Sequence, residues 1–135
     1  MGYSMNDWPT YTIPSAIADL AATTKMHNRS SYDQVNYFIG DAAYQNSGSH
    51  VMANLLESGE IQNFQHMEKY WNRCFFDYLR CEPQEHNVIL TEPPMNSPEN
   101  RETIAEIMFE TFNVKGLHIS VQACLALYGN WYDEQ

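Results

Sequence analysis

The side chains that could do chemistry in this sequence form no known catalytic motif. The five histidines are His27, His50, His66, His86 and His118. None belongs to an H-E-x-x-H motif or stands at zinc-binding spacing from a cysteine, so we expect no metal site. No serine lies in a G-x-S-x-G turn, and no glycine-rich segment leads into a helix. The residues therefore predict no nucleophilic catalysis and, in this chain by itself, no triphosphate-binding loop.

The carboxylates that could act at a site edge are Glu92, Glu99, Glu102, Glu106 and Glu110. We expect the last four to lie on the solvated face of a helix. Glu92 has two interpretations, because it follows an apolar run. It is either a functional group at the end of a strand or half of an ion pair with Arg101, and the residues alone leave both open.

Composition and charge exclude several classes of protein. The 135 residues include 44% hydrophobic side chains, which is enough for the core of one domain. Seven basic residues against seventeen acidic ones give a net charge of −10, which argues against a nucleic-acid or anionic-membrane surface. No apolar run has the length of a membrane span, and the first residues show no signal-peptide pattern. Cys74, Cys81 and Cys124 are odd in number and widely spaced, so we expect buried thiols in a reducing compartment.

The first half of the chain shows weak periodicity and the middle shows a strong helical one. Residues 1–60 are expected to be irregular, with strand-like runs at Tyr11–Ile17 and Asn36–Ile39. Residues 61–80 are predicted to be helical. One face of this helix carries Phe64, Met67, Trp71, Cys74, Phe75 and Tyr78.

The elements that would position Glu92 are a strand, a helix and a second strand. Val88–Leu90 reads as a strand covered on both faces, and Leu117–Val121 reads as its parallel partner. Ser97 and Pro98 are suited to begin the helix between them. This βαβ unit predicts an α/β fold, in which ligands bind beyond the carboxyl ends of the strands. That edge brings Thr91–Asn96 next to Gln122, where a last short helix, Gln122–Tyr128, begins.

Tryptophan side chains are candidate anchors for a partner, because tryptophan is enriched at interface hot spots. Trp71 falls on the apolar face of the predicted helix, so we expect it in the core. Trp8 and Trp131 lie near the two ends of the sequence and are better placed for an interface.

Five short motifs carry a family resemblance in order and in register. They are Met67–Trp71, Leu90–Asn96, Asn100–Glu102, Ile107–Asn113 and Val121–Ala123. On these motifs the chain resembles actin and the actin-related proteins. The resemblance implies the small-domain half of an actin-like ATPase fold, with a mixed sheet, as one partial domain over 1–135. Within it, 1–60 would be the irregular, hairpin region and 61–135 the helix plus the βαβ unit.

The resemblance also implies roles for particular residues. Gln122 matches the glutamine that positions the attacking water, Pro94 and Asn96 match the loop beside the phosphate exit, and Tyr128 matches a tyrosine of the groove that receives partners. Ser58 stands where the family has a histidine. The complete fold clamps ATP and Mg between two domains. Both phosphate loops fall outside these residues, so we expect this chain alone to bind no nucleotide and to hydrolyse none.

The motifs around Pro93 and Pro98–Glu102 resemble in particular the branch of the family that is found in the actin-related protein 2/3 complex. That branch implies a cytoplasmic, cytoskeletal protein whose partners are actin and the other subunits of the complex, which nucleates branched filaments. The chain is interpreted as a fragment, a truncated paralogue or a partial gene model. A stand-alone interaction module without nucleotide, or a non-functional fragment, remains the alternative.

Overall fold

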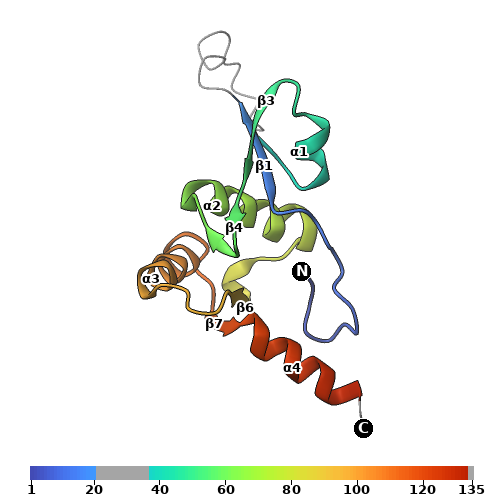
Figure 1. Cartoon of the computed structure of the whole chain (residues 1–135), viewed down its shortest axis with the longest axis vertical. Coiled ribbons are helices and arrows are strands. Elements are labelled where there is room, and N and C mark those ends of the chain that lie inside the picture. Colours follow the sequence, from blue (N-terminus) through green and yellow to red (C-terminus); the bar gives the residue numbers. More distant parts are fainter. Residues whose placement is uncertain (21–36, 134–135) are drawn as a thin grey trace. The chain divides into compact units, whose positions relative to one another are not determined.

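The computed structural model describes residues 1–20 and 37–133, which form two compact units (Figure 1). One unit comprises Met1–Leu55 and Gln65–Leu79, and the other comprises Leu56–Phe64 and Arg80–Gln135. Each unit has its own helices, and the described residues form one sheet in the first unit and two in the second. We call them the first and the second unit and describe each by itself.

The first unit is built around a three-stranded antiparallel sheet in the order β2-β1-β3. Its elements are β1 (Ala16–Leu20), β2 (Tyr37–Ile39), α1 (Asp41–Gln45), β3 (His50–Asn54), α2 (Phe64–Arg73, from Gln65 on) and a π-helical extension of α2 (Cys74–Leu79). In the central strand, Ile17 is opposite Ile39 of β2 and Ala53 of β3. The sequence predicts an irregular region over 1–60 with strand-like runs at Tyr11–Ile17 and Asn36–Ile39, and its described part holds this sheet. The second run contains β2, although Asn36 lies outside the described residues, whereas the first run overlaps β1 only at Ala16 and Ile17.

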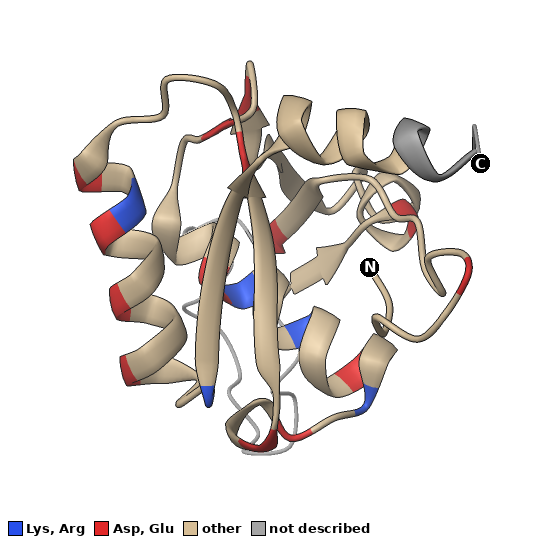
Figure 2. Cartoon of the chain, turned by 90° about the horizontal axis from the view of Figure 1, so that it is seen from below, with Lys and Arg blue, Asp and Glu red and all other residues tan. Residues whose placement is uncertain are grey.

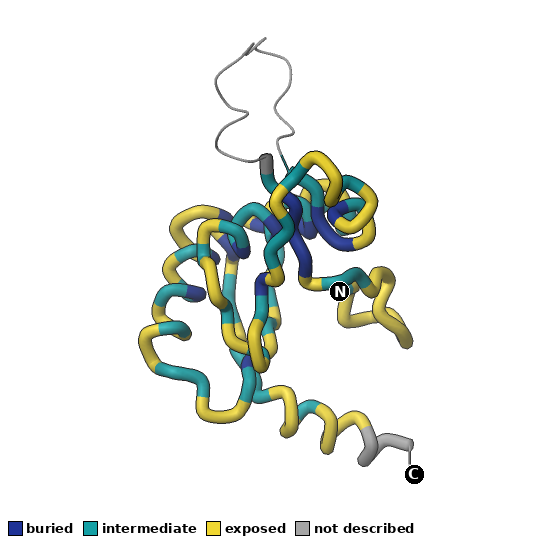
Figure 3. The backbone as a smooth tube through the Cα atoms, turned by 45° about the horizontal axis from the view of Figure 1, so that its top comes forward, coloured by how far each residue is buried: buried dark blue, intermediate teal, exposed yellow. Residues whose placement is uncertain are grey.

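Ala16, Ile17 and Ala18 of β1 are all buried, and Figure 3 colours buried residues dark blue. Both faces of β1 are therefore covered, because consecutive side chains of a strand point to opposite faces. On one face, Ala16 and Ala18 pack with Ala43 of α1, since alanine side chains let the short helix approach closely. On the other face, Ile17 is completely buried, and Asp19 is paired with Lys69 of α2. The helix α2 therefore lies against the face that carries Ile17 and Asp19.

The helix predicted over 61–80 is confirmed, with its start at Phe64 and a π-helical last turn. Its buried side chains are Met67, Tyr70, Cys74 and Phe75. The prediction that Trp71 lies in the core is wrong, because Trp71 is half-buried and the neighbouring Tyr70 is buried. The hydroxyl of Tyr70 donates a hydrogen bond of 3.2 Å to the carbonyl of Pro14, which ties the helix to the segment before β1.

The second unit contains the predicted βαβ arrangement. Its elements are β4 (Leu56–Glu57), β5 (Glu60–Ile61), a 3-10 turn (Pro83–Glu85), β6 (Asn87–Glu92), α3 (Pro98–Glu106) with a π-helical extension (Ile107–Thr111), β7 (Gly116–Val121) and α4 (Gln122–Asp133). The strands β6 and β7 are parallel, from Asn87 opposite Gly116 to Glu92 opposite Val121.

The residues at which α3 begins and its extension ends also agree with the signals in the sequence. The side chain of Ser97 accepts a hydrogen bond of 3.1 Å from the amide of Asn100, and Asn113, two residues beyond the π-helical extension, takes a left-handed φ of 51°.

Three sequence predictions for this unit need correction. Val88–Leu90 was expected to be covered on both faces, but the side chain of Ile89 is 63% exposed. Among the described residues β6 pairs with β7 alone, and its burial alternates along the strand. The ladder also continues through Thr91 and Glu92, and α4 extends to Asp133, five residues beyond the expected end.

Candidate functional site at the carboxyl edge of β6 and β7

The carboxyl ends of the two parallel strands bring together the segments that the sequence singles out. Glu92 ends β6 opposite Val121, which ends β7. Gln122 is the first residue of α4, and its Nε2 donates a hydrogen bond of 3.3 Å to Oγ1 of Thr91. The predicted proximity of Thr91–Asn96 and Gln122 is therefore confirmed.

The centre of this edge is the buried carboxylate of Glu92, which is 4% exposed. The guanidinium of Arg101 donates from Nε at 3.1 Å to Oε2 and from its terminal nitrogen at 2.8 Å to Oε1. This two-point geometry is the strong form of an arginine–carboxylate pair. The hydrogen bonds from Arg101 keep the pKa of Glu92 below its usual value, despite its burial. Of the two interpretations of Glu92, the ion pair with Arg101 is the one observed.

The loop after β6 is held through the side chain of Asn96. Its Nδ2 donates at 3.1 Å to Oε2 of Glu92, and its Oδ1 accepts from Nδ2 of Asn100 at 3.3 Å. Pro94 and Met95 are exposed, and Met95 has a positive φ of 62°. The loop is thus fixed at Asn96 and presents Pro94 and Met95 outward.

The β4–β5 hairpin supports the same loop, a contact that sequence reasoning missed. A Cβ added at Gly59, whose φ is +86°, would stand 3.1 Å from Cβ of Pro93. Ser58 precedes it with a φ of 53°, so the two residues form the turn with positive φ that short hairpins favour. The Ser-Gly pair was a signal for the turn. The contact with Pro93 had no signal, because it joins residues 34 positions apart.

None of the hydrogen bonds described above involves Tyr128 or Trp8. Tyr128 is 66% exposed on α4, next to Leu127, which is 72% exposed. Trp8 is 83% exposed. Trp131 belongs to α4, but its side chain lies outside the described residues.

The cysteines are free thiols in three different settings. Cys74 is buried, and burial raises its pKa to about 12. Cys81 is partly buried and Cys124 is exposed on α4, so the expectation of buried thiols is wrong for Cys124. None of the three forms a disulfide bond.

No group of three or more histidine, cysteine or acidic side chains in residues 1–20 and 37–133 could hold a metal ion. The guanidinium of Arg101 points to Glu92 and is neutralised there. Figure 2 marks acidic positions in red along the ribbon of α3, and they add negative charge to this unit.

Comparison with known proteins defines the class of the protein. The Actin family model matches residues 1–132, so the chain belongs to the actin family, and its α/β architecture is part of that fold. Within the family, the chain is similar to actin-related protein 3. It is 50% identical to that protein of Dictyostelium discoideum over 134 residues, which are 97% of this chain and 32% of the relative. The Acanthamoeba castellanii protein is 46% identical over all of this chain and 34% of its own length. The Caenorhabditis elegans protein is 45% identical over 97% of this chain and 33% of its own length.

The chain spans about a third of the length of the curated relatives that it matches. In the described part of the chain, no helix is both long and apolar enough to cross a membrane.

Proposed function

We propose that this chain works in actin-filament nucleation, in the role of an actin-related protein 3. Its partners are then actin and the other subunits of the actin-related protein 2/3 complex, and its place is the cytoskeleton in the cytoplasm. The observation that carries the proposal is the 50% identity to the Dictyostelium protein over 97% of the chain. On this proposal residues 1–135 form one partial domain of the actin-like fold.

The carboxyl edge of β6 and β7 is the part of the molecule that would face a nucleotide. Gln122 has the role of orienting the attacking water, and Pro94 and Asn96 form the loop beside the phosphate exit. The hydrogen bond from Gln122 to Thr91 supports this role, because it orients the amide at the strand end. The nucleotide supplies the phosphoryl group to be cleaved, and it is bound only when the rest of the actin-like fold completes the site.

Copurification tests the assembly role. A tagged chain is expressed in cells and its bound proteins are compared for Tyr128→Ser and for Tyr44→Ser, which alters another exposed tyrosine, 53% exposed on α1. We expect actin and subunits of the complex to copurify with the unaltered chain and with the Tyr44 variant. The Tyr128 variant is expected to recover less. If neither actin nor any subunit of the complex is recovered with the unaltered chain, the proposal is wrong.

Phosphate release by a preparation in which the rest of the actin-like fold completes the site tests Gln122. Gln122→Ala is expected to slow ATP cleavage by about 10²-fold, since a displaced reacting group loses its orientation. Gln84→Ala is the matched control, because Gln84 is an exposed glutamine of the 3-10 turn. Equal rates for both variants would remove Gln122 from the reaction and leave the assembly role intact.

Thermal unfolding with and without Mg-ATP tests the nucleotide directly. We expect the isolated chain to unfold at the same temperature in both conditions, because the described edge holds no anion-binding loop. A higher midpoint with Mg-ATP would contradict this expectation, since only a ligand that binds the folded state raises it.

A further inference from the structure

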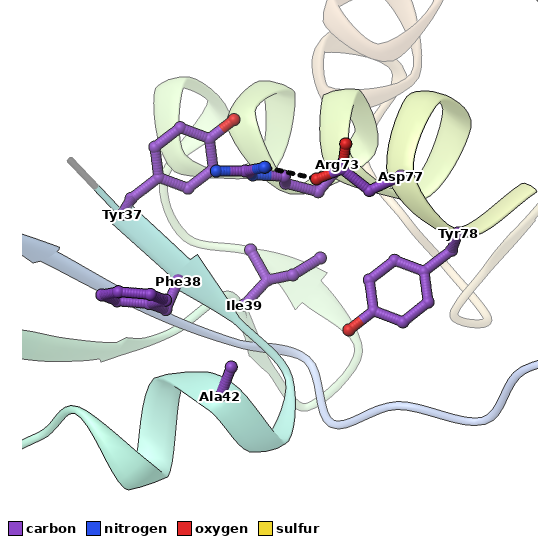
Figure 4. A pocket seen from close by; sticks show the side chains of 7 residues that line it. All are labelled: Tyr37, Phe38, Ile39, Ala42, Arg73, Asp77 and Tyr78. Atoms are coloured by element: carbon purple, nitrogen blue, oxygen red, sulfur yellow. Dashed lines mark hydrogen bonds and ion pairs between the residues drawn. The ribbon is translucent and has the colours of Figure 1, made fainter. Parts of the chain in front are cut away.

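The first unit contains a hollow of about 200 Å³, lined by residues of β2, α1 and α2 with its extension (Figure 4). Tyr37, Ala42 and Asp77 are among the residues that line it. The lining also holds Arg73, whose charge is paired with that of Asp77, as the dashed line in Figure 4 marks. Because these two charges neutralise each other, the hollow selects no particular ligand. The carboxyl edge of β6 and β7 in the second unit instead holds polar side chains in a defined hydrogen-bonded order.

The end of β6 is held on both of its faces. Consecutive side chains of a strand point to opposite faces, so Thr91 and Glu92 point away from each other. Glu92 is buried and receives hydrogen bonds from Arg101 and Asn96. Thr91 is exposed, and its Oγ1 accepts the hydrogen bond of 3.3 Å from Nε2 of Gln122. The buried face thus fixes the end of the strand, and the exposed face holds the amide of Gln122.

Both partners of the hydrogen bond between Thr91 and Gln122 are restricted in their movement. Threonine is branched at Cβ, which limits its χ1 angle and hence the positions of its hydroxyl. The backbone of Thr91 is paired in the ladder opposite Ser120, two residues before Gln122. Gln122 is the first residue of α4, so its backbone belongs to a helix. The hydroxyl of Thr91 is therefore a fixed acceptor beside a fixed glutamine.

The direction of this hydrogen bond decides which end of the Gln122 amide is left for another partner. A glutamine side chain has a donor end, Nε2, and an acceptor end, Oε1. Thr91 takes the donor end. Among the described residues, nothing donates a hydrogen bond to Oε1 of Gln122. The end that is left is thus an acceptor, which can receive a hydrogen bond from a water molecule.

We propose that Thr91 is a positioning residue for Gln122. Its hydroxyl holds Nε2, so that Oε1 faces the attacking water and accepts a hydrogen bond from it. Without this bond the amide can turn by half a rotation about its last side-chain torsion, which has two similar minima. The amide would then present a donor to the water instead of an acceptor. This role of Thr91 depends on the proposed role of Gln122.

Hydrogen exchange of the side-chain amide of Gln122, followed by NMR in the whole chain, tests the hydrogen bond without a nucleotide. We expect an Nε2 proton of Gln122 to exchange with water about 3–10 times more slowly than those of Gln84, an exposed glutamine of the 3-10 turn. Thr91→Val removes the hydroxyl and should abolish this difference, whereas Thr91→Ser should keep it. Ser120→Ala is the matched control, because it removes the hydroxyl opposite Thr91 in the ladder. Fast exchange in the unaltered chain, or slow exchange in Thr91→Val, overturns the proposal.

Phosphate release by a preparation in which the rest of the actin-like fold completes the site tests the positioning. Thr91→Val is expected to lower kcat by about 3–10-fold, which is what one neutral hydrogen bond contributes. KM should stay unchanged, because Thr91 holds Gln122 and not the nucleotide. Thr91→Ser should recover most of the rate, and Ser120→Ala should retain it. If Thr91→Val does not fold, Thr91→Ala replaces it in both experiments.

The two roles can fail separately. If Thr91→Val keeps the full rate while Gln122→Ala is slow, Thr91 is not a positioning residue and the proposed role of Gln122 stands. If Gln122→Ala also keeps the full rate, both roles are wrong. A raised KM in Thr91→Val, or an equal loss of rate in Ser120→Ala, would mean that the substitution disturbs the sheet, and it contradicts the positioning role.

Discussion

Strand β1 of the first unit buries apolar side chains, whereas strand β6 of the second unit buries a charged one. In β1, the side chains of Ala16, Ile17 and Ala18 are at most 1% exposed. In β6, whose six residues are all described, only Glu92 is buried. Strand β1 has a partner on each side, whereas among the described residues β6 has one. Strand β1 therefore stabilises its unit by removing apolar side chains from water. Strand β6 instead ends on a buried charge, which needs an ion-pair or hydrogen-bond partner.

The largest effect is expected when the apolar interior of β1 is reduced. Ile17→Ala should lower the free energy of unfolding by about 2–5 kcal/mol, because the side chain is completely buried and leaves a cavity. Ile89→Ala, the same change in β6, should cost less than about 1 kcal/mol because Ile89 is 63% exposed. Urea unfolding of both variants measures the two values. Equal losses would show that the two strands do not differ in burial.

The charged end of β6 should make the second unit sensitive to pH. The pKa of Glu92 is lower in the folded chain than the value of about 4.3 in an unfolded one. Its contribution to stability is thus complete above about pH 4.3 and is lost as the pH falls through the lower folded value. Arg101→Gln should therefore destabilise the chain at neutral pH, and the difference from the unaltered chain should shrink in acid.

Urea unfolding at several pH values checks this expectation, with Lys115→Gln as a control. Lys115 is an exposed lysine of the same unit, so its replacement removes a charge without touching Glu92. If the Arg101 and Lys115 variants show the same pH dependence, the ion pair does not hold Glu92 in its charged form.

The loop that follows Glu92 should depend on the hairpin beneath it. Gly59→Ala should cost about 1–2 kcal/mol, since the φ of +86° strains an alanine and its Cβ meets Pro93. Gly48→Ala is the matched change in the first unit, at a position with open space around the new Cβ, and should cost little. Thermal unfolding compares the two. A larger loss at Gly48 would contradict the contact between the hairpin and the loop.

The smallest effect is expected at the start of α3. Ser97→Ala should cost about 1 kcal/mol, because the amide of Asn100 loses its hydrogen-bond acceptor. Ser47→Ala, in the exposed turn after α1, should be close to neutral. Urea unfolding resolves a difference of this size. No difference between the two serines would mean that the cap contributes nothing to stability.

The βαβ unit was predictable because its signals are local. Ser97 and Pro98 mark a helix start, and the apolar runs on either side mark strands. The ion pair of Glu92 and Arg101 was one of two interpretations, and the residues alone did not choose between them. The three-stranded sheet was not predictable from the same kind of signal. Strand β1 is rich in alanine and has no clear alternation, and its pairing with β3 joins residues 30 to 38 positions apart.

The hollow in the first unit shows the same limit. Tyr37, Ala42 and Asp77 carry no shared motif, and three separate elements bring them together. The exposure of Ile89 was missed for a related reason. A run of apolar residues indicates which side chains of a strand can be buried. Which of them are buried depends on the elements that pack against the strand.

The sequence by itself determined the family, the order of strand, helix and strand after residue 86, and the residues that meet at the carboxyl edge. These features depend on short motifs, caps and periodicity, all of which act over a few neighbouring residues. Only the tertiary structure decided that Glu92 is buried against Arg101 and Asn96, that Gly59 supports Pro93, and that β1 is the covered strand. Those outcomes depend on contacts between distant segments, whose energies arise only when the chain has folded.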